Sequence, residues 1–236
     1  MSGIGWKVDI GPRRLWTGGH MPGTHDRIIA DAAKAALGPL GFRRKGRSRT
    51  WLADHGWWLT VVEFQPSAWS KGSYLNVAAH WLWSEIGTLS FDFGGRIAEH
   101  VEYVTDGQFT RAAAQLAESA AVEAQRLTEM FESLSKAAKV LLEQTQTESG
   151  QPHLHPGWSD YNAGVAAALV GRPDEARKMF SGILDSPAPP GSLLHPAAER
   201  MAQLLSDPTG LREEVMSLIK RQREALRLPP LTRPPF

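Results

Sequence analysis

The feature that most constrains this chain is a long helical stretch in its middle. Residues 109–144, FTRAAAQLAESAAVEAQRLTEMFESLSKAAKVLLEQ, contain no glycine or proline and are rich in alanine, leucine and glutamate. These residue types favour the α-helix. At about 1.5 Å per residue, a single straight helix of this length would be longer than a compact domain. We therefore expect one bent helix or two helices, with different structures before and after them.

The part before this stretch begins with a helical pattern. Thr24 is a candidate N-cap, and apolar residues recur at helical spacing from Ile28 to Leu37. Gly38-Pro39 follows, and proline disfavours helix in the residue before it. The sequence therefore predicts a helix that begins near Thr24 and ends at Gly38.

Further along, the apolar pattern changes to that of strands. Residues 49–53 and 57–65 flank Asp54-His55-Gly56, and glycine supplies the positive φ that a hairpin turn needs. Two more strands are predicted at residues 74–83 and 90–93. A helix followed by an antiparallel sheet predicts an α+β unit.

The part after the long helical stretch contains a repeat-like segment. Residues 161–184, YNAGVAAALVGRPDEARKMFSGIL, resemble a single tetratricopeptide unit, with Gly164, Gly171, Ala176 and Phe180 at the spacing of that family. The resemblance implies a pair of closely packed helices. One unit does not make a peptide-binding groove, and its apolar faces need neighbouring helices to cover them.

These patterns predict an α+β fold, in which an N-terminal helix and an antiparallel sheet precede an all-α, tetratricopeptide-like region. The first segment has five glycines and two prolines without a helical or strand period, which is typical of a loose leader. The expected organisation is a leader at residues 1–22, an α+β domain at 23–105, a helical domain at 106–229 and a proline-rich tail at 230–236.

Composition narrows the classes of function. The chain has 26 Lys and Arg against 25 Asp and Glu, a net charge of +1, so its overall field does not favour nonspecific binding to nucleic acid or anionic membranes. It has no cysteine, which excludes disulfides and thiolate chemistry. No apolar run is long enough to span a bilayer, and the N-terminus lacks the pattern of a signal peptide. We therefore expect a cytoplasmic protein.

No sequence motif indicates a cofactor, a metal ion or a catalytic centre. The P-loop, the dinucleotide fingerprint, the glycine-framed serine and the HExxH helix are all missing. His153 and His155 lie two residues apart, but no carboxylate stands near them to complete a metal site. Accordingly, neither a cofactor nor a metal nor a catalytic residue is predicted.

Positive charge is concentrated in one place despite the neutral balance of the chain. The segment GFRRKGRSRTW, residues 41–51, carries five cationic side chains, those of Arg43, Arg44, Lys45, Arg47 and Arg49. Arginines before a strand can simply keep a sheet edge soluble. Alternatively, several arginines in one loop can bind phosphate or carboxylate groups. We favour an anion site.

Polar residues also recur on one predicted sheet face. Strand alternation places Glu63, Gln65, Tyr74, Asn76 and His80 on a common face if the hairpin register is regular. Such a face is commonly just solvated. The alternative is a ligand face with tryptophan walls. The complete set of candidate ligand-binding residues is Arg43, Arg44, Lys45, Arg47, Trp57, Glu63, Gln65, Trp69, Asn76 and His80.

The N-terminal part also resembles a known family. The order LGPLGFRRKGRSRTW and then VVEFQPSAWSKGSYLNV is similar to the bacterial family called domain of unknown function 4304. The resemblance implies a bacterial origin and an α+β fold, and it implies no activity. The positions that carry it are Gly41, Phe42, Arg43, Lys45, Gly46, Phe64, Gln65, Ser67, Trp69 and Asn76.

Together these observations favour a noncatalytic recognition or adaptor protein that binds an anionic ligand or an acidic protein partner. The family-like resemblance suggests bacterial defence or toxin neutralisation as a setting. The alternative is an enzyme that acts on a phosphorylated or nucleic-acid substrate through His80, Glu63 and the arginines. Nucleic acid is the less favoured partner, because the chain carries no recognised nucleic-acid motif.

Overall fold

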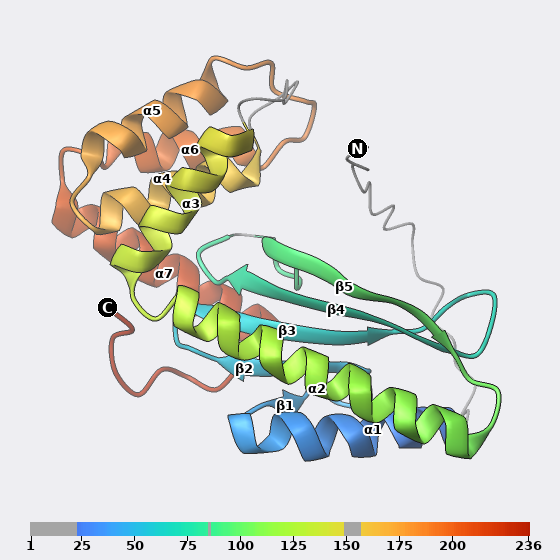
Figure 1. The fold of residues 1–236 in the computed structure, drawn as a ribbon. Helices are drawn as coiled ribbons and strands as arrows, with labels where there is room; N and C mark the ends of the chain where they lie inside the picture. The colour runs from blue at the N-terminus through green and yellow to red at the C-terminus, as the bar shows by residue number, and fades with distance from the viewer. Residues whose placement is uncertain (1–22, 85, 149–156) are drawn as a thin grey trace.

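A computed structural model describes residues 23–84, 86–148 and 157–236 of the chain. The expected leader and the histidines at 153 and 155 lie outside these described residues. The described part forms an α+β fold with a helical C-terminal region, as the sequence predicts (Figure 1).

The N-terminal part is a helix followed by a five-stranded antiparallel sheet. Helix α1 (Thr24–Leu37) leads through a short 3₁₀ turn, η1 (Gly38–Leu40), into strands that pair in chain order. The expected hairpin and the third strand are confirmed. The strands are β1 (Arg43–Arg44), β2 (Thr50–Asp54), β3 (Trp58–Gln65), β4 (Gly72–Trp81) and β5 (Phe93–Glu102).

The start of α1 differs from the sequence prediction by one residue. Gly23 is the N-cap, and Thr24 is already helical. The Asp26 carboxylate accepts a hydrogen bond from the Gly23 amide at 3.1 Å. That bond satisfies an amide that would otherwise lack a partner at the helix start. The cap of this helix is therefore made by Asp26 and Gly23, and the assignment of Thr24 was wrong.

The fourth predicted strand was also misplaced. Residues 90–93 contribute only Phe93 to β5, which runs on to Glu102. The sequence pattern did not indicate this strand, because glycine is depleted in strands and two glycines occupy positions 94 and 95. Gly94 has a φ of 98°, and a Cβ atom there would lie 2.7 Å from the Val77 carbonyl oxygen. Glycine is therefore required for β5 to approach β4 this closely.

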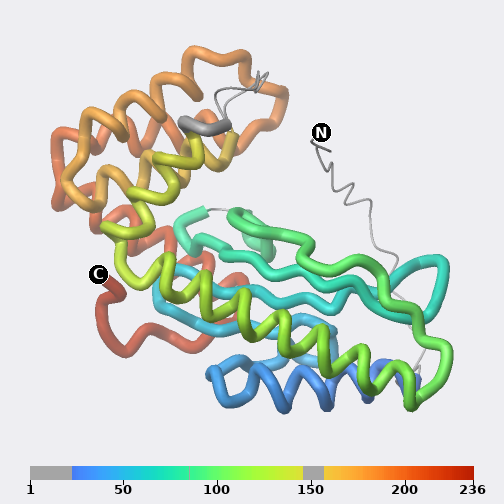
Figure 2. Tube along the Cα trace, viewed as in Figure 1, coloured from blue at the N-terminus to red at the C-terminus, as the bar shows by residue number. Residues whose placement is uncertain are grey.

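The long helical stretch forms two helices, one of the two outcomes expected. Helix α2 (Asp106–Met130) ends just before Phe131, and α3 (Leu134–Glu148) follows after a short break. Although α2 begins at the expected domain boundary, it packs beside α1 and against β4 of the sheet. Figure 2 shows α2 crossing the sheet before the chain turns away into α3. The first helix after the boundary therefore belongs to the packing of the α+β part.

The C-terminal region is an all-helical layer built around the repeat-like hairpin. Helices α4 (Trp158–Leu169) and α5 (Pro173–Leu184) pair over residues 161–184, and α3 packs on α4. A Cβ atom on Gly164 would lie 2.6 Å from the Phe180 ring, so the helices cross too closely for a side chain at that position. The remaining helices are α6 (Leu194–Gln203) and α7 (Pro208–Leu226).

The end of α7 joins the helical region to the sheet. The Arg223 guanidinium donates to both Asp54 carboxylate oxygens, at 2.9 and 2.6 Å, and to the carbonyl oxygens of Gly56 and Pro229. Pro235 of the C-terminal tail lies against Gly56. One end of the sheet, at the β2–β3 hairpin, is therefore covered by a helix and the chain terminus (Figure 1).

Candidate anion-binding site

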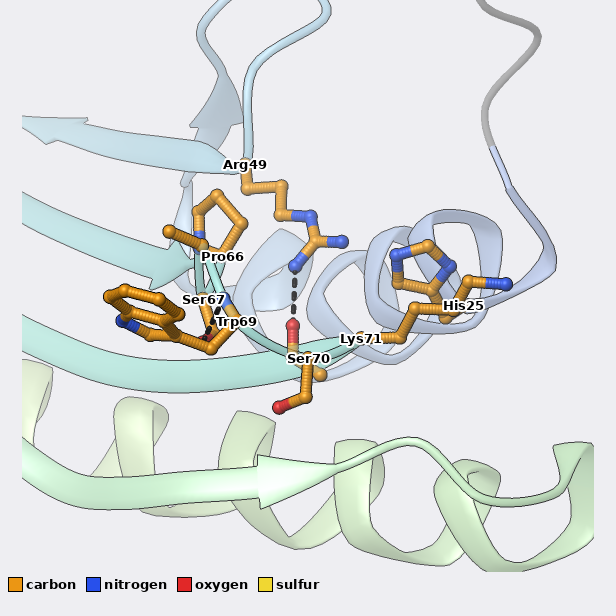
Figure 3. A pocket seen from close by; sticks show the side chains of 9 residues that line it. His25, Arg49, Pro66, Ser67, Trp69, Ser70 and Lys71 are labelled. Atoms are coloured by element: carbon orange, nitrogen blue, oxygen red, sulfur yellow. Dashed lines mark hydrogen bonds between the residues drawn. The ribbon is translucent and has the colours of Figure 1, made fainter.

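The opposite end of the sheet holds an open hollow. The loop between β3 and β4 meets the start of α1 there, and the hollow measures about 310 Å³ (Figure 3). Three segments that are distant in sequence come together around it: the first turn of α1, the residue before β2, and the β3–β4 loop. The lining residues are His25, Arg49, Pro66, Ser67, Ala68, Trp69, Ser70, Lys71 and Gly72.

Arg49 supplies a fixed positive charge at the base of this hollow. Its Nε donates to Asp26 Oδ1 at 2.7 Å, and Nη1 donates to the Gly72 carbonyl oxygen at 2.9 Å. The Arg49 side chain is only 11% exposed. Burial opposes ionisation of Asp26, but the hydrogen bond and charge of Arg49 outweigh it and hold the pKa of that carboxyl below its ordinary value. Asp26 is therefore ionised and paired at neutral pH.

Lys71 carries positive charge that is not neutralised within the described residues. Its side chain is exposed, and its ammonium forms neither a hydrogen bond nor an ion pair with any residue that the structure describes. Because Asp26 balances Arg49, the Lys71 ammonium dominates the net charge of the hollow. An ammonium has three donors to offer a ligand.

His25 lies on the first turn of α1 and faces the same hollow. Burial lowers the pKa of its imidazole; the carboxylate of Asp26 opposes that shift, and the charges of Arg49 and Lys71 add to it. The ring is therefore mostly neutral at pH 7. Burial is the main cause of this neutral state, and the positive charges of the hollow reinforce it.

Trp69 stands at the rim of the hollow and is 94% exposed. Its loop is tightened by a hydrogen bond from the Trp69 amide to Ser67 Oγ at 3.1 Å. A tryptophan that projects from a short loop is unusual on a monomer surface, and this residue type is enriched at the centres of binding interfaces. The sequence-predicted Trp69 thus lies at the candidate site.

The basic cluster of the sequence lies at the same end of the sheet. Thr50 at the start of β2 pairs with Glu63 near the end of β3, so the β1–β2 turn and the β3–β4 loop emerge together. Arg43, Lys45 and Arg47 are exposed. Arg44 instead folds over its own turn, where Nε donates to the Ser48 carbonyl oxygen at 2.6 Å. Three of the four predicted cations therefore remain open to a ligand.

The polar sheet face predicted from strand alternation is present. Asn76 lies opposite Glu63, and Tyr74 opposite Gln65. The Asn76 amide donates to Glu63 at 3.1 Å and to Gln65 at 2.9 Å. Arg96 of β5 donates to Gln65 at 2.9 Å. These side chains bond one another, so the face is a connected polar network beside the hollow and not part of its lining.

Three predicted site residues are buried: Asn76, which is 4% exposed within the polar network, and Trp57 and His80. Trp57 is 5% exposed and packs in a cluster with Trp81 and Trp83, with ring centroids 5.6 and 5.2 Å away. It forms no wall of a ligand face, so this prediction was wrong. Its neighbour Trp58 is equally buried, because the start of β3 is covered on both sides. Strand alternation correctly predicted which side chains share a sheet face, but it could not predict which parts of each face are buried by other segments.

His80 is fully buried beneath α7 and is likewise a wrong prediction. Its Nδ1 lies 2.7 Å from Ser90 Oγ, and Nε2 lies 3.2 Å from Gln222 Nε2. His80 pairs across the sheet with Leu59, four residues before Glu63. At about 3.3 Å per residue, that offset separates His80 from Glu63 by roughly 13 Å. The acid–base pair of the enzyme hypothesis therefore does not form.

Sequence reasoning missed three contributors to the hollow. Arg49 belongs to the basic cluster, but it was not singled out as a site residue. Lys71 lies in the turn-rich segment QPSAWSKGS, and His25 lies in the first turn of a predicted helix. Local patterns placed His25 in its helix and Lys71 in its loop, and they placed Arg49 one residue inside the strand that it in fact precedes. Only the packing of α1 along the sheet brings them together.

Within residues 23–84, 86–148 and 157–236, no three His, Cys, Asp or Glu side chains are grouped so that they could hold a metal ion. In the same segments, no helix combines the length and the apolar character needed to cross a membrane.

Comparisons with known proteins add no information on the function of this chain. No known protein family, no curated protein sequence and no solved structure matches this chain. The structure is that of an α+β protein with a helical C-terminal region. One end of its sheet carries basic residues and the exposed Trp69.

Proposed function

We propose that this chain is a noncatalytic recognition or adaptor protein that binds an acidic segment of a partner protein at the basic end of its sheet. One observation carries the proposal: His25, Arg49 and Lys71, from three separate segments, line one hollow beside a 94% exposed tryptophan. If these residues only stabilised the fold, Trp69 would not need to be exposed and Lys71 would not need to lie beside it without a partner among the described residues.

The surroundings of the hollow fit a protein partner. Arg43, Lys45 and Arg47 extend the positive surface beyond the hollow, over an area suited to several carboxylates. Trp69 offers a large apolar contact at the rim. A central aromatic anchor surrounded by charged groups is the usual arrangement of an interface that steers and then holds its partner.

The biological setting rests on resemblance alone. The similarity of the N-terminal part to domain of unknown function 4304 supports a bacterial protein, and we propose a role in defence or toxin neutralisation. In that role the basic end would hold the acidic partner, and the helical region would present a second surface to other components.

A direct test uses a fluorescein-labelled oligoglutamate peptide as the probe. We expect the wild-type protein to bind it with an affinity that falls as salt screens the attraction. Replacing Arg43, Arg47 and Lys71 together by glutamine should abolish binding. A matched variant with Lys34, Lys178 and Lys220 replaced by glutamine removes the same charge from exposed positions elsewhere and should bind normally.

Fluorescence anisotropy over a salt series measures both variants. Circular dichroism melts verify that each variant is folded. Equal binding by the two triple variants would show that the attraction is a property of overall charge and would refute a site at the basic end.

A further inference from the structure

We infer that the hollow beside Trp69 is a subsite for a phosphate monoester, namely a phosphoserine or phosphothreonine side chain in the acidic partner segment. This inference rests on the proposed function and adds a specific group to it. The basic surface outside the hollow suits carboxylates, whereas the hollow itself gathers donors and positive charge that a phosphoryl group can use.

Apart from Arg49, the donors that remain free in the hollow come from three residues. The Lys71 ammonium has no partner among the described residues. Ser67 Oγ accepts the hydrogen bond of the Trp69 amide, so its own hydroxyl proton is available. His25 contributes a ring nitrogen. A phosphate monoester carries three acceptor oxygens and close to two charges, and therefore uses such a set more fully than a carboxylate does.

Arg49 is already paired with Asp26, so it orders the hollow and offers a ligand only the second N–H of Nη1 and of Nη2. Its Nε and Nη2 are engaged by Asp26, and Nη1 by the Gly72 carbonyl oxygen. Figure 3 shows its guanidinium between the β3–β4 loop and the His25 ring. Because Asp26 is held by Arg49, its carboxylate is compensated and does not prevent the approach of an anion. The pair fixes the shape of the hollow before a ligand arrives.

His25 links binding to protonation. The groups that face it are Asp26 on its own helix, Arg49, Lys71 of the loop, and the Tyr103 ring at 5.6 Å, whose hydroxyl donates to Asp106. Among the neighbours at the β4–β5 end are also His100, near Ser70 Oγ, and Glu102, which pairs with Gly72. A dianion in the hollow would offset the charges of Arg49 and Lys71 that disfavour the imidazolium. Binding should therefore raise the pKa of His25.

The experiment compares one acidic peptide in three forms, with phosphoserine, serine or glutamate at a single position. Isothermal titration calorimetry on the full chain should show the phosphoserine form binding about tenfold more tightly than the glutamate form. Lys71→Gln should remove most of this preference. Lys34→Gln, at the far end of α1, should retain it.

Nuclear magnetic resonance of the His25 ring gives a second, independent measurement. The pKa of His25 should rise when the phosphoserine peptide saturates the protein, and it should rise less with the glutamate form. His25→Gln should reduce the proton uptake seen in calorimetry while leaving the salt dependence of binding in place.

The two proposals can fail separately. If all three peptides bind with similar affinity and salt dependence, the phosphate subsite is wrong while the acidic-partner function stands. If adenosine 5′-monophosphate binds the hollow more tightly than the phosphoserine peptide does, the hollow serves a nucleotide and the inference is also wrong. If none of these probes binds, both proposals fall.

Discussion

The two ends of the sheet use the same residue types for different purposes. Each end has an arginine–aspartate pair, Arg49–Asp26 at the open end and Arg223–Asp54 at the closed end. At the closed end, α7 and the C-terminal tail bury the Arg223 side chain, while Asp54 stays exposed, and two carbonyl groups occupy the rest of the guanidinium. At the open end, a hollow and a further cation, Lys71, remain. The candidate site therefore lies at the end of the sheet where packing leaves a charged group, the Lys71 ammonium, without a partner among the described residues.

The histidines of the two ends show the same contrast. His55, at the closed end, stacks on Trp58 at a centroid distance of 3.9 Å and lies 2.9 Å from Thr60 Oγ1. Burial lowers its pKa to about 4, against the opposing charge of Asp54. His25, at the open end, instead faces the hollow and neighbouring cations. The partly buried His55 imidazole is held by Trp58 and Thr60, whereas the His25 imidazole faces the hollow and can respond to a ligand.

The largest expected effect is at the closed end. Arg223→Ala should lower the free energy of unfolding by about 3 kcal/mol, because it removes a buried guanidinium and leaves the carbonyl groups of Gly56 and Pro229 without their donor. Urea denaturation measures the loss. Lys220→Ala, an exposed change on the same helix, is the control. If Arg49→Ala destabilises the protein more than Arg223→Ala, the open end is the more structural of the two and the contrast is reversed.

The second prediction concerns acid stability at the closed end. The folded-state pKa of His55, about 4, is below its unfolded value near 6.5, so the unfolded chain binds more protons between these pH values. Stability from this group is complete above pH 6.5 and is lost as the pH falls toward 4, by about 3 kcal/mol in total.

Denaturant unfolding of wild type and His55→Gln at pH 7 and pH 4.5 isolates this contribution. Other groups titrate in both proteins and cancel in the difference. We expect the stability of wild type to fall more steeply with decreasing pH than that of the variant. Parallel pH profiles would mean that His55 is accessible to protons and that the closed end is not sealed.

The smallest effect on stability is expected at the open end. Trp69→Ala should change the free energy of unfolding by less than about 0.5 kcal/mol, because the side chain is exposed. The same change should weaken oligoglutamate binding clearly. Thermal melts and anisotropy titrations measure the two effects together. If Trp69→Ala lowers stability but leaves the affinity for oligoglutamate unchanged, the Trp69 side chain stabilises the fold and takes no part in binding.

Much of the fold follows from local patterns in the sequence. The helical spacing up to Leu37, the glycine turn between β2 and β3, and the glycine-free stretch at 109–144 all predict their elements correctly. These signals are local because helix propensity, turn geometry and strand alternation depend on neighbouring residues. They also predicted that Glu63 and Asn76 share a sheet face.

The tertiary structure alone decided which polar residues remain open to a ligand. Trp57 and His80 have the same alternation as the partly exposed Glu63 and Gln65, yet packing at the closed end buries them. His25 and Lys71 carry no sequence signal for a site, yet the packing of α1 along the sheet brings them to Arg49. Burial depends on contacts between segments far apart in the chain. Local sequence therefore determines the helices, the strands and the side chains that share a face. Packing between distant segments determines which of these faces is exposed to solvent and can bind a ligand.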